Sequence, residues 1–278
     1  MKKPKNELDY IAEQVKNHDP DRFLWAMLMP DSVRHDLWTL FAFNYEIAKT
    51  REVVTETTLG LIRLQWWRDA LSAIYEGGDV PQHEVVKPLQ DVIEKHDLPR
   101  EWFDSLIYAR EFDLEDVLPA NKEGLYNYAD YTSVPLLKLA AKICGENPDH
   151  DALPAIARGY AIAGLLRSVV FHAEQGRCYL PEDELRVRNL EPRFFQNGIG
   201  ASLKKDGFLE SMASIVKEIT DEAIEAIPKT KLEDRFLETG RRFAKLHLKQ
   251  IKGLKYDSFD PRIAMQPPFF HFRLLLNI

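Results

Sequence analysis

Three arginines are the residues of this chain best suited to bind an anionic group: Arg34, Arg167 and Arg177. A guanidinium group forms two parallel hydrogen bonds with phosphate oxygens, so arginines brought together by the fold would suit a diphosphate. In helical proteins such arginines more often pair with Asp or Glu. The sequence therefore leaves two roles open for them, phosphate binding and ion pairing.

Two groups of aromatic residues also have two interpretations. Trp66 and Trp67 are adjacent, and Phe269, Phe270 and Phe272 lie near the C-terminus. We interpret both groups as packing residues of the core, because aromatic side chains bury a large apolar area. The alternative is that they line an apolar tunnel or a surface that contacts a partner.

The elements that position these residues are predicted to be helices, because apolar residues recur at helical spacing and no segment alternates like a strand. Gly77-Gly78 ends one helix, while Pro81 and Pro99 fit the first turns of two others. Pro135 should kink the helix that contains it. We expect helices at residues 36–53, 59–76, 81–96, 99–116, 126–143, 153–173, 209–227, 232–253 and 268–276.

The composition excludes several classes of protein. A hydrophobic content of 45% is enough for a large core, and a net charge of −7 argues against a nucleic-acid binder or a polybasic membrane anchor. Cys144 and Cys178 form no disulfide framework or zinc-site spacing. No linker divides the helical pattern, so we expect a single all-α domain over residues 1–278.

The chain has no apolar stretch near the ~20 residues that a transmembrane helix needs. Residues 1–9 contain basic and acidic residues but no apolar run, unlike a signal or transit peptide. We therefore expect a cytoplasmic protein without a transmembrane segment. Peripheral attachment to the inner membrane is the alternative.

Two segments resemble the signature helices of the squalene/phytoene synthase family, whose enzymes join two prenyl diphosphates head to head. The first segment runs from Leu40 to Glu52. The second runs from Gly159 to Pro181 and ends in Gly-Arg-Cys-Tyr-Leu-Pro, similar to the family's Gly-Arg-x-Tyr-Leu-Pro. The resemblance covers residues 15–250. It implies a trans-isoprenyl-synthase-like helical bundle around a central cavity, with the two signature helices facing each other across it.

The same resemblance implies that the family's metal-binding aspartates are missing. Their positions fall on Ala48, Lys49, Glu52, Gly164, Ser168 and His172. Only Glu52 keeps a carboxylate, whereas Mg²⁺ prefers carboxylate and other oxygen ligands. The resemblance thus implies no metal site, no catalytic residue and no cofactor. Mg²⁺ would be required only if the protein were an active transferase.

Two of these positions need separate interpretation. Lys49 either supplies the positive charge of the missing metal or pairs with Glu46 or Glu52 on the same helix, and we favour pairing. His172 lies on one helical stripe with Gly164 and Ser168, where no second His or Cys is available to bind a metal with it. We therefore interpret His172 as a structural or capping residue.

The departures from the enzyme pattern themselves resemble one branch of the family. Phe43-Asn44-x-Glu46 and Glu56-x-x-Leu59-Gly60-x-x-Arg63-x-Gln65-x-Trp67 are similar to the group of mitochondrial complex I assembly factor 6. That group lacks the aspartates and is implicated in building NADH:ubiquinone oxidoreductase. The resemblance implies a bacterial relative whose partner is a complex I subunit or assembly intermediate.

Three functions follow as hypotheses. The first is a catalytically degenerate scaffold that assists the assembly of complex I, and we rank it first because it explains both the retained segments and the lost ligands. The second is a head-to-head transferase that uses farnesyl or geranylgeranyl diphosphate. The third is a protein that binds an isoprenoid lipid without converting it.

Overall fold

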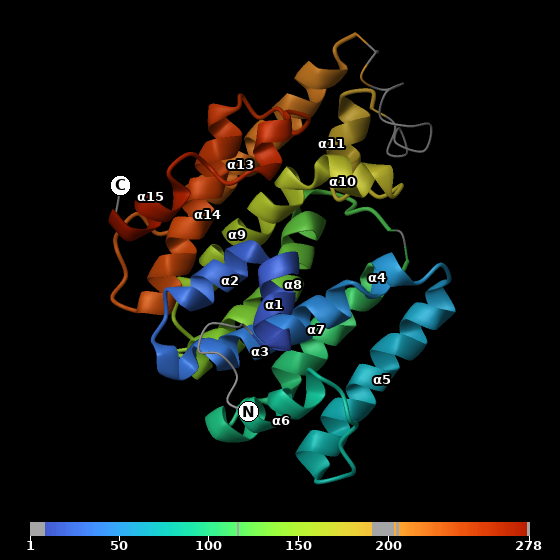
Figure 1. Ribbon diagram of the computed structural model, residues 1–278. Coiled ribbons are helices and arrows are strands. Elements are labelled where there is room, and N and C mark those ends of the chain that lie inside the picture. Colours follow the sequence, from blue (N-terminus) through green and yellow to red (C-terminus); the bar gives the residue numbers. More distant parts are fainter. Residues whose placement is uncertain (1–8, 116, 191–202, 204–205, 277–278) are drawn as a thin grey trace. The chain divides into compact units, whose positions relative to one another are not determined.

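Helices account for every regular segment in the part of the chain that the structure describes (Figure 1), as the apolar spacing predicted. The structure is a computed structural model, and it describes residues 9–115, 117–190, 203 and 206–276. No helix within these ranges is long and apolar enough to cross a membrane.

Contacts divide the chain into two compact units. The first consists of Met1–Glu115, Pro135–His150 and Asp234–Phe236, and the second of Asp116–Val134, Asp151–Glu233 and Leu237–Ile278. Two helices belong to both units. Lys122–Ile143 (α8) crosses the division at Pro135, and Arg235–Gly253 (α14) crosses it after Phe236.

The first unit is built around one buried helix. Its other helices are α1 (Tyr10–His18), α2 (Pro20–Met27), α4 (Thr50–Val53), α5 (Thr57–Glu76), α6 (Val86–His96), α7 (Arg100–Phe112) and the end of α8, and the buried helix is α3 (Asp31–Ala48). Leu40, Phe43 and Ile47 of α3 are fully buried, and the helix packs against α1, α2, α6 and α7. The apolar pattern predicted this central position for α3.

The second unit has a separate apolar core. Its helices are the beginning of α8, α9 (Leu153–Arg167), α10 (Val169–Glu174), α11 (Glu182–Val187), α13 (Phe208–Ala226), α14, η1 (Pro261–Ala264) and α15 (Phe270–Leu276). α9 packs against α13, with Ile162 and Leu166 from α9 and Ile215 and Ile219 from α13 in one buried cluster.

Both helices that carry the signature segments differ from the predicted ranges. The helix predicted over 36–53 begins at Asp31, where Pro30 precedes the first turn, and it is interrupted at Lys49. The helix predicted over 153–173 is interrupted at Ser168, whose backbone has φ −105° and ψ 13°. Apolar spacing continues through both interruptions, so the sequence pattern did not reveal them.

The prediction that Pro81 starts a helix was wrong. α6 begins only at Val86, and in the turn before it the amide of Val85 donates to Nδ1 of His83 over 3.1 Å. Pro99 does stand at the start of α7, as predicted, but α7 ends at Phe112 instead of continuing to residue 116. The end of α5 at Gly77, in the left-handed conformation with φ 73°, was predicted correctly.

Two predictions about the arrangement stay predictions. The first is a single domain over residues 1–278. The second is that the signature helices face each other across a cavity, since one belongs to the first unit and the other to the second.

Two glycines of α9 have opposite surroundings. A methyl group added to Gly159 would lie 2.6 Å from Cδ1 and 3.0 Å from Cγ1 of the buried side chain of Ile227. A methyl group added to Gly164 would have nothing within 4 Å. Close packing therefore requires glycine at position 159, whereas position 164 borders open space.

We expect Gly159→Ala to be less stable than Gly164→Ala by about 1–3 kcal/mol, the usual penalty for overpacking a core. The gain in helix propensity, about 1 kcal/mol, is common to both variants and cancels in the comparison. Unfolding by denaturant measures the difference in free energy. Equal stabilities, or a more stable Gly159→Ala protein, would contradict the packing of Gly159 against Ile227.

Candidate functional site

The first signature segment, residues 40–52, is organised around a buried carboxylate. The side chain of Glu46 is 5% exposed, and its two oxygens contact two different cations. Nζ of Lys49 lies 2.5 Å from Oε1, and Nη2 of Arg63 on α5 lies 2.8 Å from Oε2. Lys49 is therefore paired with Glu46, as favoured from the sequence, and its ammonium group lies where α3 ends.

Ala48 and Glu52, the other two predicted metal-ligand positions of this segment, place no further metal ligand beside Glu46. Ala48 has no polar side-chain atom, and Glu52 is exposed on α4. A divalent cation placed beside Lys49 would be repelled by its ammonium group. The first signature segment thus does not fit Mg²⁺, which needs several oxygen ligands.

The second signature segment, residues 159–181, keeps its helical register across the break in α9. The amide of Ser168 donates to the carbonyl of Gly164 over 3.1 Å, and the amide of His172 donates to the carbonyl of Ser168 over 2.9 Å. The three predicted positions stay one turn apart, but they present a hydrogen, a hydroxyl and an imidazole. These groups do not replace the carboxylates that Mg²⁺ prefers. Within the described ranges, no three His, Cys, Asp or Glu side chains gather closely enough to hold a metal.

A small apolar pocket lies beside the second segment. Its walls are formed by Leu125, Ile162, Leu165, Leu166, Val169, His172, Arg177, Cys178, Tyr179 and Leu180. The ring centroids of His172 and Tyr179 are 4.7 Å apart, and those of Tyr179 and Tyr128 are 5.1 Å apart. Burial raises the pKa of the Cys178 thiol to about 12, so this side chain is a neutral thiol and not a nucleophile. The cavity volume is about 10 Å³, enough for about one water molecule.

Two of the three candidate phosphate-binding arginines are held by other parts of the protein. Arg34 donates to the carbonyls of Met27 and Met29, each over 3.1 Å, and thereby caps the end of α2. Nε of Arg167 donates to the carbonyl of Ile263 over 3.1 Å, and its Nη1 lies 3.4 Å from Nε2 of His247. Nη1 of Arg34 also lies 2.6 Å from Oδ1 of Asp31, an ion pair of the kind that the sequence left open. The sequence did not indicate the carbonyl contacts of the two arginines.

Arg177 is different from these two arginines. Its amide donates to the carbonyl of His172 over 2.8 Å, and its side chain lines the apolar pocket. Among the residues that the structure describes, no ion pair engages its guanidinium group. Arg177 is therefore the candidate best placed to meet an anionic ligand.

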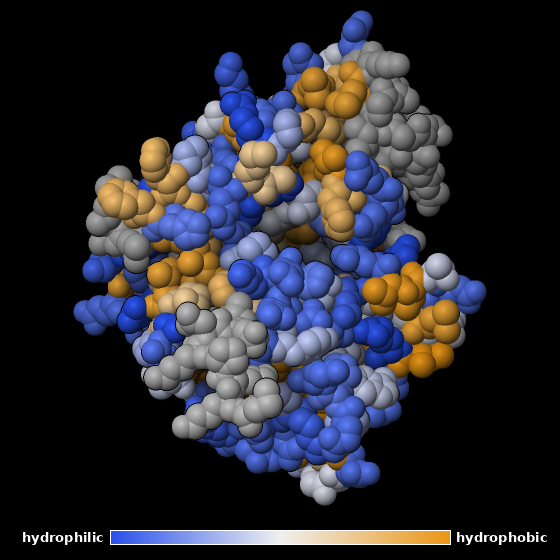
Figure 2. All heavy atoms as spheres, viewed as in Figure 1, coloured by the Kyte–Doolittle hydropathy of each residue, from blue (hydrophilic) through white to orange (hydrophobic). Residues whose placement is uncertain are grey.

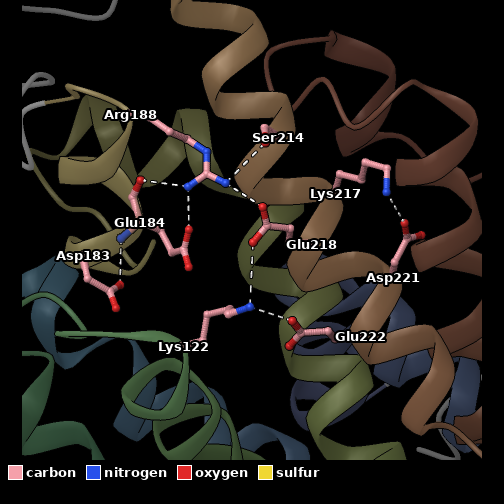
Figure 3. Close-up of polar contacts among 9 residues, drawn as sticks. All are labelled: Lys122, Asp183, Glu184, Arg188, Ser214, Lys217, Glu218, Asp221 and Glu222. Atoms are coloured by element: carbon pink, nitrogen blue, oxygen red, sulfur yellow. Dashed lines mark hydrogen bonds and ion pairs between the residues drawn. The ribbon is translucent and has the colours of Figure 1, made fainter.

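A cluster of charged residues in the second unit links three of its helices by ion pairs (Figure 3). Nη1 of Arg188 lies 2.5 Å from Oε2 of Glu184, and Nη2 of Arg188 lies 2.6 Å from Oε1 of Glu218 on α13. Lys122, at the start of α8, lies 2.6 Å from Glu222, and this hydrogen bond raises the pKa of Lys122. Two cations contact three carboxylates here, and these ion pairs join α8 and α11 to α13.

Several residues of the two branch-like motifs contact one another, although their spacing in sequence does not indicate it. Glu46 and Arg63 form an ion pair, and the rings of Phe43 and Trp67 meet edge to face with centroids 5.4 Å apart. Gly60 leaves room for the side chain of Leu114. Except for Leu114, these residues belong to the two motifs that resemble one branch of the family, and this was the signal that could have identified them. Their contacts show that these motifs join α3 to α5.

Comparisons with known proteins agree along most of the chain. A model of the family described as squalene/phytoene synthase matches residues 15–268. NADH dehydrogenase (ubiquinone) complex I, assembly factor 6, of Bos taurus is 33% identical over 177 residues, which are 63% of this chain and 53% of that protein. The matched part of the chain therefore spans about half the length of that relative.

Two further relatives allow a comparison over similar lengths. The assembly factor 6 of Mus musculus is 28% identical over 272 residues, covering 92% of this chain and 77% of that protein. The chloroplastic phytoene synthase of Daucus carota is 22% identical over 266 residues, covering 91% of this chain and 65% of that protein.

A solved structure of a dehydrosqualene synthase in complex with ligand has the same fold. The TM-score is 0.74 at 17% sequence identity, over 96% of this chain and 93% of the other. At this level of identity the similarity concerns the fold alone. It confirms the all-α, isoprenoid-synthase-like fold that the signature segments implied.

Replacing Glu46 with Gln should destabilise the protein by about 1–3 kcal/mol, because two cations lose a buried carboxylate. The expected loss is smaller than for a fully buried pair, since Lys49 and Arg63 are partly exposed. The matched control is Glu52→Gln on exposed α4, which should change stability by less than about 0.5 kcal/mol. Unfolding by denaturant compares the two variants, and similar effects of both would contradict a structural role for Glu46.

Proposed function

Because the chain belongs to the squalene/phytoene synthase family, we propose that it is a member without metal-dependent catalysis that assists the assembly of respiratory complex I. The observation that carries this proposal is the state of the metal-ligand positions. Lys49 is bound to Glu46, and Gly164, Ser168 and His172 provide no carboxylate. A diphosphate leaving group carries negative charge that metal ions held by aspartates usually neutralise. Without those aspartates, a different group would have to neutralise this charge.

The relatives support the same proposal. Over almost equal lengths, identity is 28% to the assembly factor 6 of Mus musculus and 22% to the phytoene synthase of Daucus carota. The contacts Glu46–Arg63 and Phe43–Trp67 involve residues of the motifs that resemble the assembly-factor branch. We infer that these residues preserve a scaffold, and that its partner is a subunit or assembly intermediate of NADH:ubiquinone oxidoreductase.

The proposed place of action follows from the partner. A protein that assists this assembly works on the cytoplasmic side of the inner membrane, in the cytoplasm or attached peripherally. Transient binding of a partner by a helical surface requires complementary shape and apolar contact, and no metal chemistry.

One observation favours a second function, the binding of an isoprenoid lipid without turnover. Arg177 borders an apolar pocket beside the second signature segment, and Gly164 borders open space. An apolar chain with an anionic end would suit this combination. The volume of the pocket, about 10 Å³, favours the scaffold, since a prenyl chain would have to displace the rings of His172 and Tyr179.

Deleting the gene should lower the amount of assembled NADH:ubiquinone oxidoreductase and leave isoprenoid lipids unchanged. Native gel electrophoresis and NADH oxidation by membranes measure the enzyme complex, and lipid extraction measures the isoprenoids. The wild-type gene supplied in trans is the control and should restore assembly. Normal complex levels together with altered isoprenoid lipids would reverse the ranking in favour of the transferase.

The purified protein should form no squalene, phytoene or presqualene-type intermediate from farnesyl or geranylgeranyl diphosphate with Mg²⁺. The expected reason is that the positions of the metal ligands hold Ala48, Lys49, Gly164, Ser168 and His172. Product analysis is compared with boiled protein as the negative control and an active family enzyme as the positive control. An amount of product above that formed with boiled protein would contradict the proposed loss of catalysis.

A further inference from the structure

One side of α5 exposes apolar residues that the first unit does not use for its own core. Leu59, Ile62 and Trp66 follow one another at helical spacing, and Val53 precedes them at the end of α4; we call these four residues the α5 face. They are 50%, 61%, 38% and 58% exposed, respectively. Figure 2 shows apolar atoms gathered over α4 and the beginning of α5. A contiguous exposed apolar surface of this kind is typical of an interaction site.

The opposite side of α5 accounts for the packing of this helix. Leu64, Trp67 and Leu71 are at most 1% exposed, and Gly60 lies against Leu114. Within its unit, α5 packs against α4 and α7. The helix therefore has a complete core side, and the α5 face is a second apolar side that remains open to solvent.

Exposed acidic residues border the α5 face, and the neighbouring cation on α4, Arg51, is only partly exposed and engaged in an interaction of its own. Glu52 and Glu56 are exposed beside Val53 and Leu59, and Asp69 is exposed one turn after Trp66. The nearest cations on α5 already form ion pairs, since Arg63 pairs with Glu46 and Arg68 pairs with Glu111. An acidic border repels the anionic surface of a membrane and attracts a basic protein partner.

We propose that the α5 face binds a helical segment of a protein partner that is apolar on one side and carries Lys or Arg beside it. The apolar row of Leu59, Ile62 and Trp66 provides a ridge that fits between the side chains of such a helix. Glu52, Glu56 and Asp69 provide the matching charges. The identity of this partner as part of complex I rests on the proposed function, whereas the binding of a basic amphipathic helix does not.

Two double variants test the two parts of the surface. Leu59→Ser with Ile62→Ser removes apolar contact, and Glu56→Lys with Asp69→Lys reverses charge. Trp66 is left unchanged because its ring contacts those of Trp67 and His83, so its replacement would disturb the fold as well. The matched control is Val187→Ser with Leu209→Ser, two exposed apolar residues of the second unit.

The binding probe is a fluorescent synthetic helix with leucines on one side and lysines on the other, measured by anisotropy with the full chain. Each α5-face variant should weaken binding about tenfold or more, the usual effect of losing central contacts. The control variant should bind like the wild type, and all variants should keep the unfolding midpoint of the wild type. Equal binding by the α5-face variants and the wild type would overturn the proposal.

Other occupants give different outcomes. Flotation with vesicles containing anionic lipid that depends on Leu59 and Ile62 would overturn the proposal in favour of a membrane. A dimer in sedimentation that the Leu59→Ser, Ile62→Ser variant abolishes would overturn it in favour of a second copy. We expect neither, because both anionic lipid and a second acidic face would be repelled by Glu52, Glu56 and Asp69.

Complementation of the deletion strain separates this proposal from the proposed function. If both hold, the Val187→Ser, Leu209→Ser variant restores the oxidoreductase and the Leu59→Ser, Ile62→Ser variant does not. Restoration by both variants would overturn the role of the α5 face and leave the assembly function intact. A deletion without effect on the oxidoreductase would contradict the assembly function, while the peptide measurement would still decide whether the α5 face binds.

Discussion

The buried carboxylate of Glu46 is the interaction on which the first signature segment depends. A charge with so little solvent around it is stable only when opposite charges and hydrogen bonds replace the lost water. Lys49 and Arg63 supply them, one from the end of α3 and the other from α5. The same contact therefore joins two helices of the first unit and places an ammonium group at the end of α3.

The two signature segments differ in what they place at the positions that the family resemblance marks as metal ligands. In the first, a cation of the protein lies beside the one buried carboxylate, so that no free acidic group remains next to it. In the second, the ligand positions hold groups without negative charge, and the rings of His172, Tyr179 and Tyr128 contact one another nearby. If the proposed loss of metal binding holds, reversing one of these differences leaves the other in place, so a single substitution would not create a metal site.

Periodic features of the sequence predicted the fold well. The rows of apolar residues that define α3 and α13 have one dominant explanation, which is burial of one or more sides of a helix. In α5 the row of Leu59, Ile62 and Trp66 is exposed, so the spacing predicted the helix and not its buried side. Local features were less informative. The interruptions at Lys49 and Ser168 occur within continuous apolar patterns, and Pro81 has the features of a first helical turn although the helix begins at Val86.

The contacts of the candidate arginines could not be predicted from spacing, because their acceptors are backbone carbonyls. Arg34 reaches carbonyls at the end of α2, and Arg167 reaches the carbonyl of Ile263, almost a hundred residues away. A backbone carbonyl leaves no trace in residue type, so an arginine that caps a helix looks the same in sequence as one that binds phosphate. Pairing of Lys49 with Glu46 was predictable because both residues lie on adjacent turns of one segment.

Pro135 has a consequence for how the native protein opens. It has no amide hydrogen, so it cannot donate to the carbonyl of Tyr131 inside α8, and the division between the two compact units falls at the same residue. The two halves of α8 form one continuous helix, but each half makes its contacts within a different unit. The amide hydrogens of each half should therefore exchange with solvent when the unit that contains this half opens. The border between two cooperative regions of the native state then lies within one continuous helix.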